Sequence, residues 1–341
     1  MDIENYFDYA AATPMLPEVV TAMQPYFSEQ FYNPSALYIG ARTNRLALDE
    51  ARHTIAKGLG ARPTEIIFTA GGTEANNMAI HGILSQFSDA HFITSAIEHD
   101  SILQPATQYN TTYVGVNYKG IIDVTQLTKA ITDTTVLVSV MLVNNEVGAI
   151  QPLHDIVEVV NTVRKQRQVS GNTRPLYIHT DACQATNYLD IQVARLGVDL
   201  LTLNAGKLYG PKQCGALFVR AGIVLTPLIH GGGQEWNLRS GTENLANIVG
   251  FATAWKRIRG TVKEETKRVT ELRDALIQGL TSQRPDCVIN GPHGNRRIAN
   301  NVHVTFPGKD NERILMELDE AGVKSQLALR AALVMMNHHM Y

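Results

Sequence analysis

Short apolar runs alternate with segments of helical spacing along the first 250 residues. Five runs are apolar at nearly every position, as is typical of strands buried on both faces of a parallel sheet, and they lie at 65–69, 91–95, 135–143, 198–203 and 215–219. Apolar residues three or four apart predict helices at 17–27, 43–59 and 154–166. We therefore predict an α/β fold with a mainly parallel central sheet and helices on both of its faces.

The last third of the chain follows a different pattern. A long stretch at 246–283 carries charges at helical spacing, and we interpret it as a helical connection to a second domain. An alternating strand at 301–306 and a helix at 311–320 come after it. We predict a large domain over residues 12–250 and a smaller α+β domain formed by residues 1–11 and 251–341.

Two of the buried strands end in residues with complementary chemistry. The run at 198–203 leads into a glycine-containing turn that holds Lys207, and a second apolar strand ends at Asp181, with Gln184 just after it. Taken alone, a loop lysine is usually only a solvated charge. Together, a lysine that can form an imine and a carboxylate that keeps a pyridine nitrogen protonated are what pyridoxal phosphate requires of its protein. We therefore predict a pyridoxal phosphate site.

Other strand ends offer groups that could complete such a site. Gly72 and Thr73 open a helix directly after the strand at 65–69, where backbone amides can face a phosphate, although the glycines also fit a simple tight turn. Thr242, in a later glycine-rich loop, is a second phosphate candidate. His99 and Asn145 follow two further strands, at the sheet edge where open α/β folds bind ligands. A capping or surface histidine is the alternative for His99.

Composition narrows the class of protein. The 341 residues carry a formal net charge of -2 and 7% aromatic residues, which gives no electrostatic or stacking case for nucleic acid or an anionic membrane. No apolar run approaches the roughly 20 residues needed to cross a bilayer, and the acidic start is no signal peptide. Three scattered cysteines argue against a disulfide framework or a zinc site. We expect a cytoplasmic protein without a structural metal.

Several stretches, in order along the chain to about Gly322, resemble the cysteine desulfurases, a branch of the class V aminotransferase-like pyridoxal phosphate enzymes. The resemblance implies the type I fold of pyridoxal phosphate-dependent transferases, with a large domain and a small α+β domain. The matching stretches are residues 7–14, 68–74, 98–99, 143–148, 179–184, 207–212 and 239–242.

The resemblance also implies roles for single residues. Lys207 would hold the cofactor covalently and move protons at the α-carbon of the substrate. His99 would stack on the pyridine ring and assist acid–base steps. Asp181 would pair with the ring nitrogen, Gln184 would bind the ring hydroxyl, and Asn145 would lie beside the ring.

For the phosphate, the resemblance implies Gly72 and Thr73, with Thr242 reaching in from a second subunit, so that a homodimer completes the site. The residues before Lys207 depart from the family's usual serine, small residue and histidine, because this chain has Asn204, Ala205 and Gly206. Asn204 can replace one of the two lost donors. Since hydrogen bonds to charged groups contribute about 1.5–3 kcal/mol each, we expect weaker retention of the cofactor.

The implied reaction converts L-cysteine to L-alanine and passes the sulfur, as a persulfide, to an acceptor protein. That acceptor would be an iron–sulfur scaffold or a tRNA thiolase. Two alternatives stay open: another class V lyase or aminotransferase that needs no cysteine nucleophile, and a catalytically inactive, cofactor-binding dimer partner.

The C-terminal region departs most from the family. The family carries its nucleophilic cysteine in a Gly-Ser-Ala-Cys context, whereas residues 322–330 of this chain contain none. When the last base of each codon is read with the first two of the next, residues 335–341 give Asp-Glu-[Ser/Pro]-[Ser/Pro]-[His/Tyr]-Val. The family pattern there is Glu-Pro-Ser-His-Val, and the same shift permits Gly-Ser-Ala-Cys over 327–331.

We therefore hypothesise a frameshift near residues 325–327. The chain would then be a truncated desulfurase that lacks its nucleophile and the arginine that binds the substrate carboxylate. A natural lineage with a divergent tail is the alternative.

Overall fold

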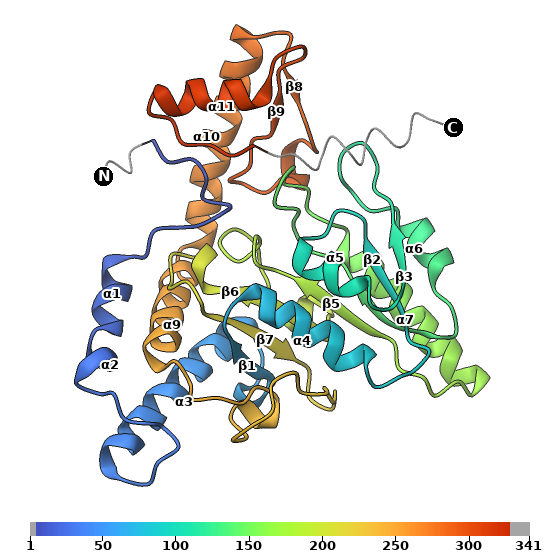
Figure 1. The fold of residues 1–341 in the computed structure, drawn as a ribbon. Coiled ribbons are helices and arrows are strands. Elements are labelled where there is room, and N and C mark those ends of the chain that lie inside the picture. The colour runs from blue at the N-terminus through green and yellow to red at the C-terminus, as the bar shows by residue number, and fades with distance from the viewer. Residues whose placement is uncertain (1–4, 328–341) are drawn as a thin grey trace.

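A seven-stranded sheet forms the centre of the computed structural model, which describes residues 5–327 (Figure 1). The strands are β1 (Ile66–Thr69), β2 (His91–Ser95), β3 (Asn110–Val114), β4 (Thr135–Ser139), β5 (Tyr177–Asp181), β6 (Leu200–Asn204) and β7 (Gly215–Val219). Their order in the sheet is β1-β7-β6-β5-β4-β2-β3. All neighbours pair in parallel except β7, which runs antiparallel to β1 and β6. The predicted α/β fold with a mainly parallel sheet is confirmed.

Helices cover both faces of this sheet, each over its own hydrophobic core. Residues that alternate along β1 separate the two cores: Ile66 and Phe68 face one, and Ile67 faces the other. This alternation is what a strand buried on both faces requires. The first core packs under α1 (Pro17–Met23), α3 (Ile39–Leu59), α6 (Val124–Ala130), α7 (Leu153–Ser170) and α9 (Leu245–Arg259). The second packs under α4 (Gly72–Leu84) and α5 (Asp100–Ala106). Short helices at α2 (Pro25–Ser28) and α8 (Val193–Leu196) complete this part of the chain.

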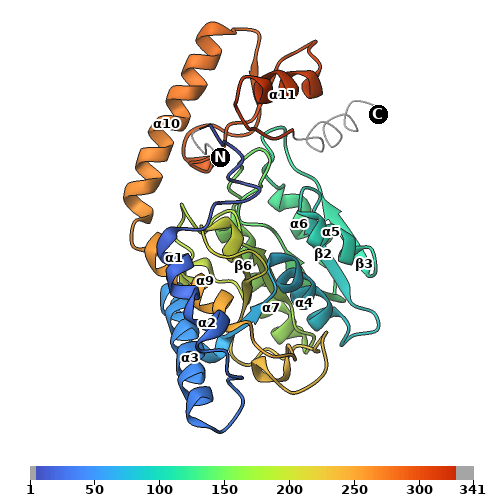
Figure 2. The same cartoon turned by 60° about the vertical axis from the view of Figure 1, so that its left-hand side comes forward.

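A smaller α+β unit stands above the carboxyl edge of the sheet, at the far end of α10 (Val262–Gln283) (Figures 1 and 2). It contains β8 (Val288–Ile289), β9 (Val304–Thr305) and α11 (Asn311–Glu320). The N-terminal segment joins it, since Phe7 N–H donates to the Lys324 carbonyl at 2.8 Å and Lys324 N–H donates to Asn5 at 2.9 Å. The domain boundaries at 11/12 and 250/251 stay predictions.

The prediction of one continuous helix over 246–283 is wrong, because this stretch forms two helices. The first, α9, ends at Arg259, and the second, α10, begins at Val262. Gly260 has a low helix propensity and Thr261 takes the position before α10, so the break falls where the backbone is least helical. Other boundaries moved less: the run at 135–143 is a strand only to Ser139, and the strand at 301–306 shortens to Val304–Thr305. The helix at 311–320 is found as predicted.

Within residues 5–327 no helix is both long and apolar enough to span a bilayer.

Candidate active site

A cavity of about 590 Å³ lies at the carboxyl edge of the sheet, between the end of β6 and the start of α4. It collects four of the residues that the sequence assigned to a cofactor, namely Gly72, Thr73, Asn204 and Lys207. Lys212, which carried no predicted role, adds a second amine to its wall. Parallel strands bring their ends to one edge, so residues far apart in sequence meet there.

The start of α4 forms one end of this cavity. Gly71 precedes the helix with a φ of 142°, a conformation that side chains rarely adopt. A Cβ on Gly72 would lie 2.9 Å from the Cys183 sulfur, so a larger residue would force one of the two to move. The 13-residue helix therefore presents its first amides and its positive dipole end to the cavity.

Three hydrogen bonds hold the backbone of the turn that carries Lys207. Asn204 caps the short helix Ala205–Lys207 by accepting from Gly206 N–H at 3.0 Å. The Thr13 hydroxyl donates to the Gly206 carbonyl at 3.1 Å, and Asn187 donates to the Lys207 carbonyl at 2.8 Å. The lysine side chain consequently starts from a rigid backbone.

Asp181 is a buried carboxylate at the end of β5. Its two oxygens accept from Asn76 Nδ2 and from Cys183 N–H, each at 2.8 Å. Burial alone would raise the pKa of Asp181, but these hydrogen bonds and the positive charge of Lys207 hold it below its usual value. The amine of Lys207 and the carboxylate of Asp181 thus act on one another.

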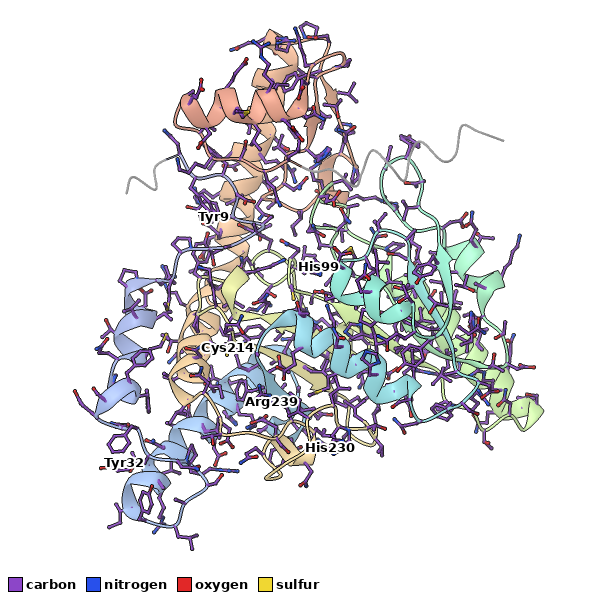
Figure 3. All side chains as sticks on the ribbon, viewed as in Figure 1. Tyr9, Tyr32, His99, Cys214, His230 and Arg239 are labelled. Atoms are coloured by element: carbon purple, nitrogen blue, oxygen red, sulfur yellow. The ribbon has the colours of Figure 1, made fainter. Side chains whose placement is uncertain are left out.

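His99 and Asn145 lie beside a second cavity, of about 480 Å³, which also contains Glu146 and Tyr118 in its wall. His99 stands at the N-terminal end of α5, on the side of the sheet that faces the smaller unit (Figure 3). Its Nδ1 accepts from Ser101 N–H at 3.1 Å and lies 2.8 Å from the Ser101 hydroxyl. His99 and Asn145 therefore line a different cavity from the one that holds Lys207.

Gln184 and Thr242 do not line the cavity that holds Lys207. The Gln184 side chain donates to the Ala10 carbonyl at 3.0 Å, which holds the N-terminal segment at the cavity rim. Thr242 is exposed and lines a third cavity, of about 240 Å³, which shares Ala70 and Gln213 with the first. Within one chain, Thr242 is a neighbour of the candidate site rather than part of it.

Two residues of this region had no role assigned to them from the sequence. Asn76 faces Asp181 from α4, one turn after Gly72, but an asparagine inside an apolar helix reads as an ordinary core residue. Glu98 is fully buried and accepts from the Ser95 hydroxyl and from Met141 N–H. Burial raises the pKa of Glu98 to about 8 despite these bonds.

The sequence and the fold of the chain were compared with those of known proteins, and they match one family. The chain belongs to the aminotransferase class-V family, whose model matches residues 5–340. Cysteine desulfurase IscS of Dictyoglomus turgidum is 42% identical over 331 residues, covering 95% of this chain and 81% of the relative. The predicted family resemblance is confirmed.

Solved structures of other proteins have the same fold. One named NifS-like protein matches with a TM-score of 0.89 and 31% identity, over 96% of this chain and 89% of the other. Another, SspA in complex with cysteine, matches with a TM-score of 0.82 and 33% identity, over 99% and 95% of the two chains.

The residues present fit pyridoxal phosphate. Asp181 is a buried carboxylate that makes no ion pair within 4 Å among the described residues, so it retains an accepting capacity for a protonated ring nitrogen. The glycine-opened helix suits a phosphate, and Lys207 supplies the amine. Nowhere in residues 5–327 do three or more His, Cys, Asp or Glu side chains gather as a metal would need.

Residues 328–341 lie outside the described part of the chain. The shifted-frame reading falls mainly there, so the hypothesis of a frameshift stays a prediction.

Proposed function

We propose that this chain is a pyridoxal phosphate-dependent cysteine desulfurase, which converts L-cysteine to L-alanine and releases the sulfur to a thiol. The observation that carries the proposal is the meeting of Lys207 and Asp181 beside the glycine-opened start of α4. A 42% identical relative named cysteine desulfurase IscS, and a similar structure with cysteine bound, support the substrate.

Bound pyridoxal phosphate supplies an electron sink for a carbanion at the substrate α-carbon. Asp181 would keep the ring nitrogen protonated, because its depressed pKa leaves the carboxylate ionised. Lys207 would hold the cofactor and carry the proton at the α-carbon. The amides of Gly72 and Thr73, with Asn204 in the wall of the same cavity, would bind the phosphate.

His99, Asn145 and Gln184 act around the ring. We assign His99 to stacking and proton transfer, since it follows β2 at the same sheet edge as Asp181. Asn145 would lie beside the ring, and Gln184 would turn its amide from the Ala10 carbonyl to the ring hydroxyl. These assignments rest on the family resemblance and on the position of the three residues after the carboxyl ends of β2, β4 and β5.

The cysteines of this chain are poorly suited to accept the sulfur as a thiolate. Its three cysteines are Cys183, Cys214 and Cys287. Burial raises the pKa of Cys183 well above its usual range and also raises that of Cys214, so neither is a thiolate near neutral pH. Cys287 lies just before β8, in the smaller unit. We therefore expect slow persulfide formation on this chain.

A second copy of the chain is the partner we propose first. Side chains at the start of α3 are unusually exposed for apolar residues, Leu37 at 95% and Ile39 at 83%. Ser35 lines one cavity with the loop at 232–237, and that loop leads to Thr242. A partner packed on Leu37 and Ile39 would therefore also meet the loop that bears Thr242. The sulfur acceptor would be an iron–sulfur scaffold or a tRNA thiolase, and the location the cytoplasm.

Incubation of the full chain with pyridoxal phosphate, L-cysteine and an added thiol tests the reaction. We expect L-alanine and sulfide in equal amounts, at a rate that depends on the added thiol. Release of pyruvate, or transfer of the amino group, would instead support another class V lyase or aminotransferase. Cofactor binding without turnover would support the inactive dimer partner.

A further inference from the structure

Four residues form a continuous line of hydrogen bonds from His99 to Asp181. His99 Nδ1 lies 2.8 Å from the Ser101 hydroxyl, and that hydroxyl lies 2.8 Å from Asn76 Nδ2. Asn76 Nδ2 also lies 2.8 Å from Asp181 Oδ2. The line joins three elements, because Asn76 belongs to α4, Ser101 to α5 and Asp181 to β5.

The donor and acceptor chemistry of Asp181 and His99 fixes which group donates in each of these hydrogen bonds. An ionised carboxylate only accepts, so Asn76 must present its amide nitrogen to Asp181. The second hydrogen of that nitrogen points to the Ser101 hydroxyl, which then directs its own hydrogen to His99 Nδ1. The Ser101 backbone N–H donates to the same Nδ1 at 3.1 Å. With two donors on Nδ1, a neutral His99 carries its proton on Nε2.

The burial of the middle residues shows how firmly this orientation is held. Asn76 is 0% exposed and Ser101 is 6% exposed, so water does not compete for their hydrogen bonds. Asn76 Oδ1 is buried and has no partner among the described residues. Rotating the amide would place this oxygen opposite the Asp181 carboxylate, so that two acceptors would face each other.

We propose that Asn76 and Ser101 are positioning residues that hold His99 as its Nε2–H tautomer and couple it to the charge of Asp181. The inference rests on the proposed function, in which His99 and Asp181 serve the same ring. Asn76 and Ser101 act through His99 and Asp181 and need not touch the substrate themselves.

Nitrogen NMR of histidine-labelled full-length chain, without cofactor, tests this directly. The His99 signals are identified by their loss in His99→Gln. We expect a pyridine-like Nδ1 and a pyrrole-like Nε2 in the wild type. In Ser101→Ala and Asn76→Ala, the midpoint of His99 protonation should rise by about one pH unit, because a bond that favours the neutral ring is lost. Glu98, Asp100 and Glu146 line the same cavity and are unchanged in every variant.

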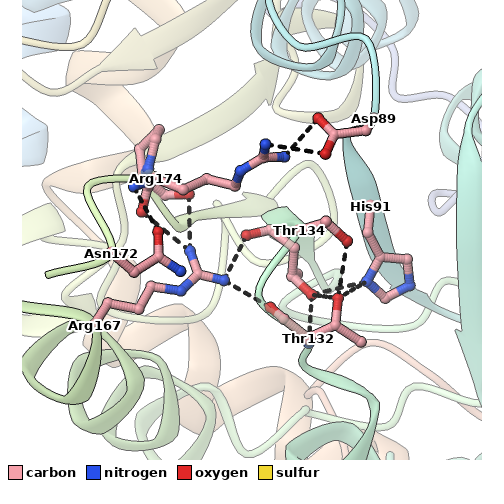
Figure 4. A network of polar contacts seen from close by, with 9 residues as sticks. Asp89, His91, Thr132, Thr134, Arg167, Asn172 and Arg174 are labelled. Atoms are coloured by element: carbon pink, nitrogen blue, oxygen red, sulfur yellow. Dashed lines mark hydrogen bonds and ion pairs between the residues drawn. The ribbon is translucent and has the colours of Figure 1, made fainter. Parts of the chain in front are cut away.

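A matched control removes the hydroxyl that bonds another histidine, His91 on β2. His91, at the opposite end of β2, lies 2.9 Å from the Thr112 hydroxyl through Nε2 and belongs to a separate polar network (Figure 4). Thr112→Val should leave the His99 signals unchanged. Since Asn76 acts through Ser101, the double variant should shift His99 no further than Ser101→Ala alone.

A protonated Nδ1 in the folded wild type would overturn the inference, as would an unchanged midpoint in folded Ser101→Ala. If Asn76→Ala does not fold, the wild-type spectrum and Ser101→Ala still decide the question. Failure of cofactor attachment at Lys207 would contradict the proposed function while leaving the NMR result intact, so the two claims fail separately.

Discussion

At the scale of single residues, the site depends on which carboxyl groups stay charged when buried. Asp181 receives a hydrogen bond on each oxygen and the field of Lys207, so its pKa is depressed despite burial. Glu98 also accepts hydrogen bonds, but burial outweighs them and its pKa rises to about 8. The two carboxyl groups are thus held in opposite protonation states at neutral pH.

Glu98 should make the stability of the protein depend on pH. Its pKa is about 8 in the fold against 4.5 for the free side chain, so the folded state binds the extra proton between these values. The free energy of unfolding should therefore fall as pH rises from about 5 to 8. Glu98→Gln, which resembles the protonated acid, should remove this component.

Urea unfolding of the cofactor-free chain at pH 5, 6, 7 and 8 provides the measurement. The difference between Glu98→Gln and wild type should grow in favour of the variant by about 3–4 kcal/mol across this range. A constant difference would show that Glu98 is ionised in the fold.

Lys207 and Asp181 could be proposed from the sequence because each lies at or shortly after the end of an apolar run, and such a strand end can be recognised from local pattern. Asn76 and Ser101 could not, because their importance lies in contacts between α4, α5 and β5. No local pattern states that an amide on one helix will face a carboxylate about 100 residues away.

At the scale of elements, the first turn of α4 depends on Gly72, which has no side chain. Gly72→Ala would place a methyl group 2.9 Å from the Cys183 sulfur. We expect a loss of about 1–3 kcal/mol in stability, together with weaker binding of pyridoxal phosphate. Gly279→Ala is the control, since Gly279 lies exposed near the C-terminal end of α10 and nothing is within 4 Å of the new Cβ. It should stabilise the chain by about 0.5–1 kcal/mol; equal effects would contradict the close approach at Gly72.

The loop before Thr242 is tied to α3 by a buried ion pair. Arg52 makes two bonds to the Glu235 carboxylate, at 2.6 and 2.7 Å, and Glu235 also accepts from Phe68 N–H at 2.8 Å. Removing one member leaves the other charge buried, so Arg52→Ala should cost about 3–5 kcal/mol in urea unfolding. On the same helix, Arg45→Ala breaks an exposed pair with Asp49 and should cost at most about 0.5 kcal/mol. Comparable losses would mean that the buried pair is not formed.

The boundaries of helices and strands show which structural features the local sequence pattern predicts and which it does not. The helix at 311–320 was found as predicted because Asp310 caps it with hydrogen bonds to Glu312 and Arg313 N–H. The run at 135–143 stays buried throughout, but beyond Ser139 it is no longer part of β4, and Leu142 N–H donates to the Asp181 backbone carbonyl. Burial was readable from the sequence there, and the end of the strand was not.

At the scale of the whole molecule, the apolar residues at the start of α3 predict association. Leu37→Lys with Ile39→Lys should convert a dimer into a monomer, because two charges would be buried in the proposed contact. Light scattering at matched concentrations provides the measurement. Val169→Lys, equally exposed at 90% near the end of α7, is the control and should leave the mass unchanged. A wild-type monomer at micromolar concentration would contradict the proposed dimer.

The architecture as a whole was predictable because alternating buried strands and helices leave few arrangements open. The division of the predicted site residues among three cavities was not, since it depends on how the strand ends are spaced in the folded sheet.

The central claim is that Lys207 is the amine of a cofactor site completed by Asp181. Borohydride reduction of the full chain with pyridoxal phosphate, followed by peptide mapping by mass spectrometry, tests it most directly. We predict a single pyridoxyl group on Lys207 that is absent from Lys207→Ala. Labelling of Lys212 or of another lysine in its place, or no stable label at all, would contradict the account.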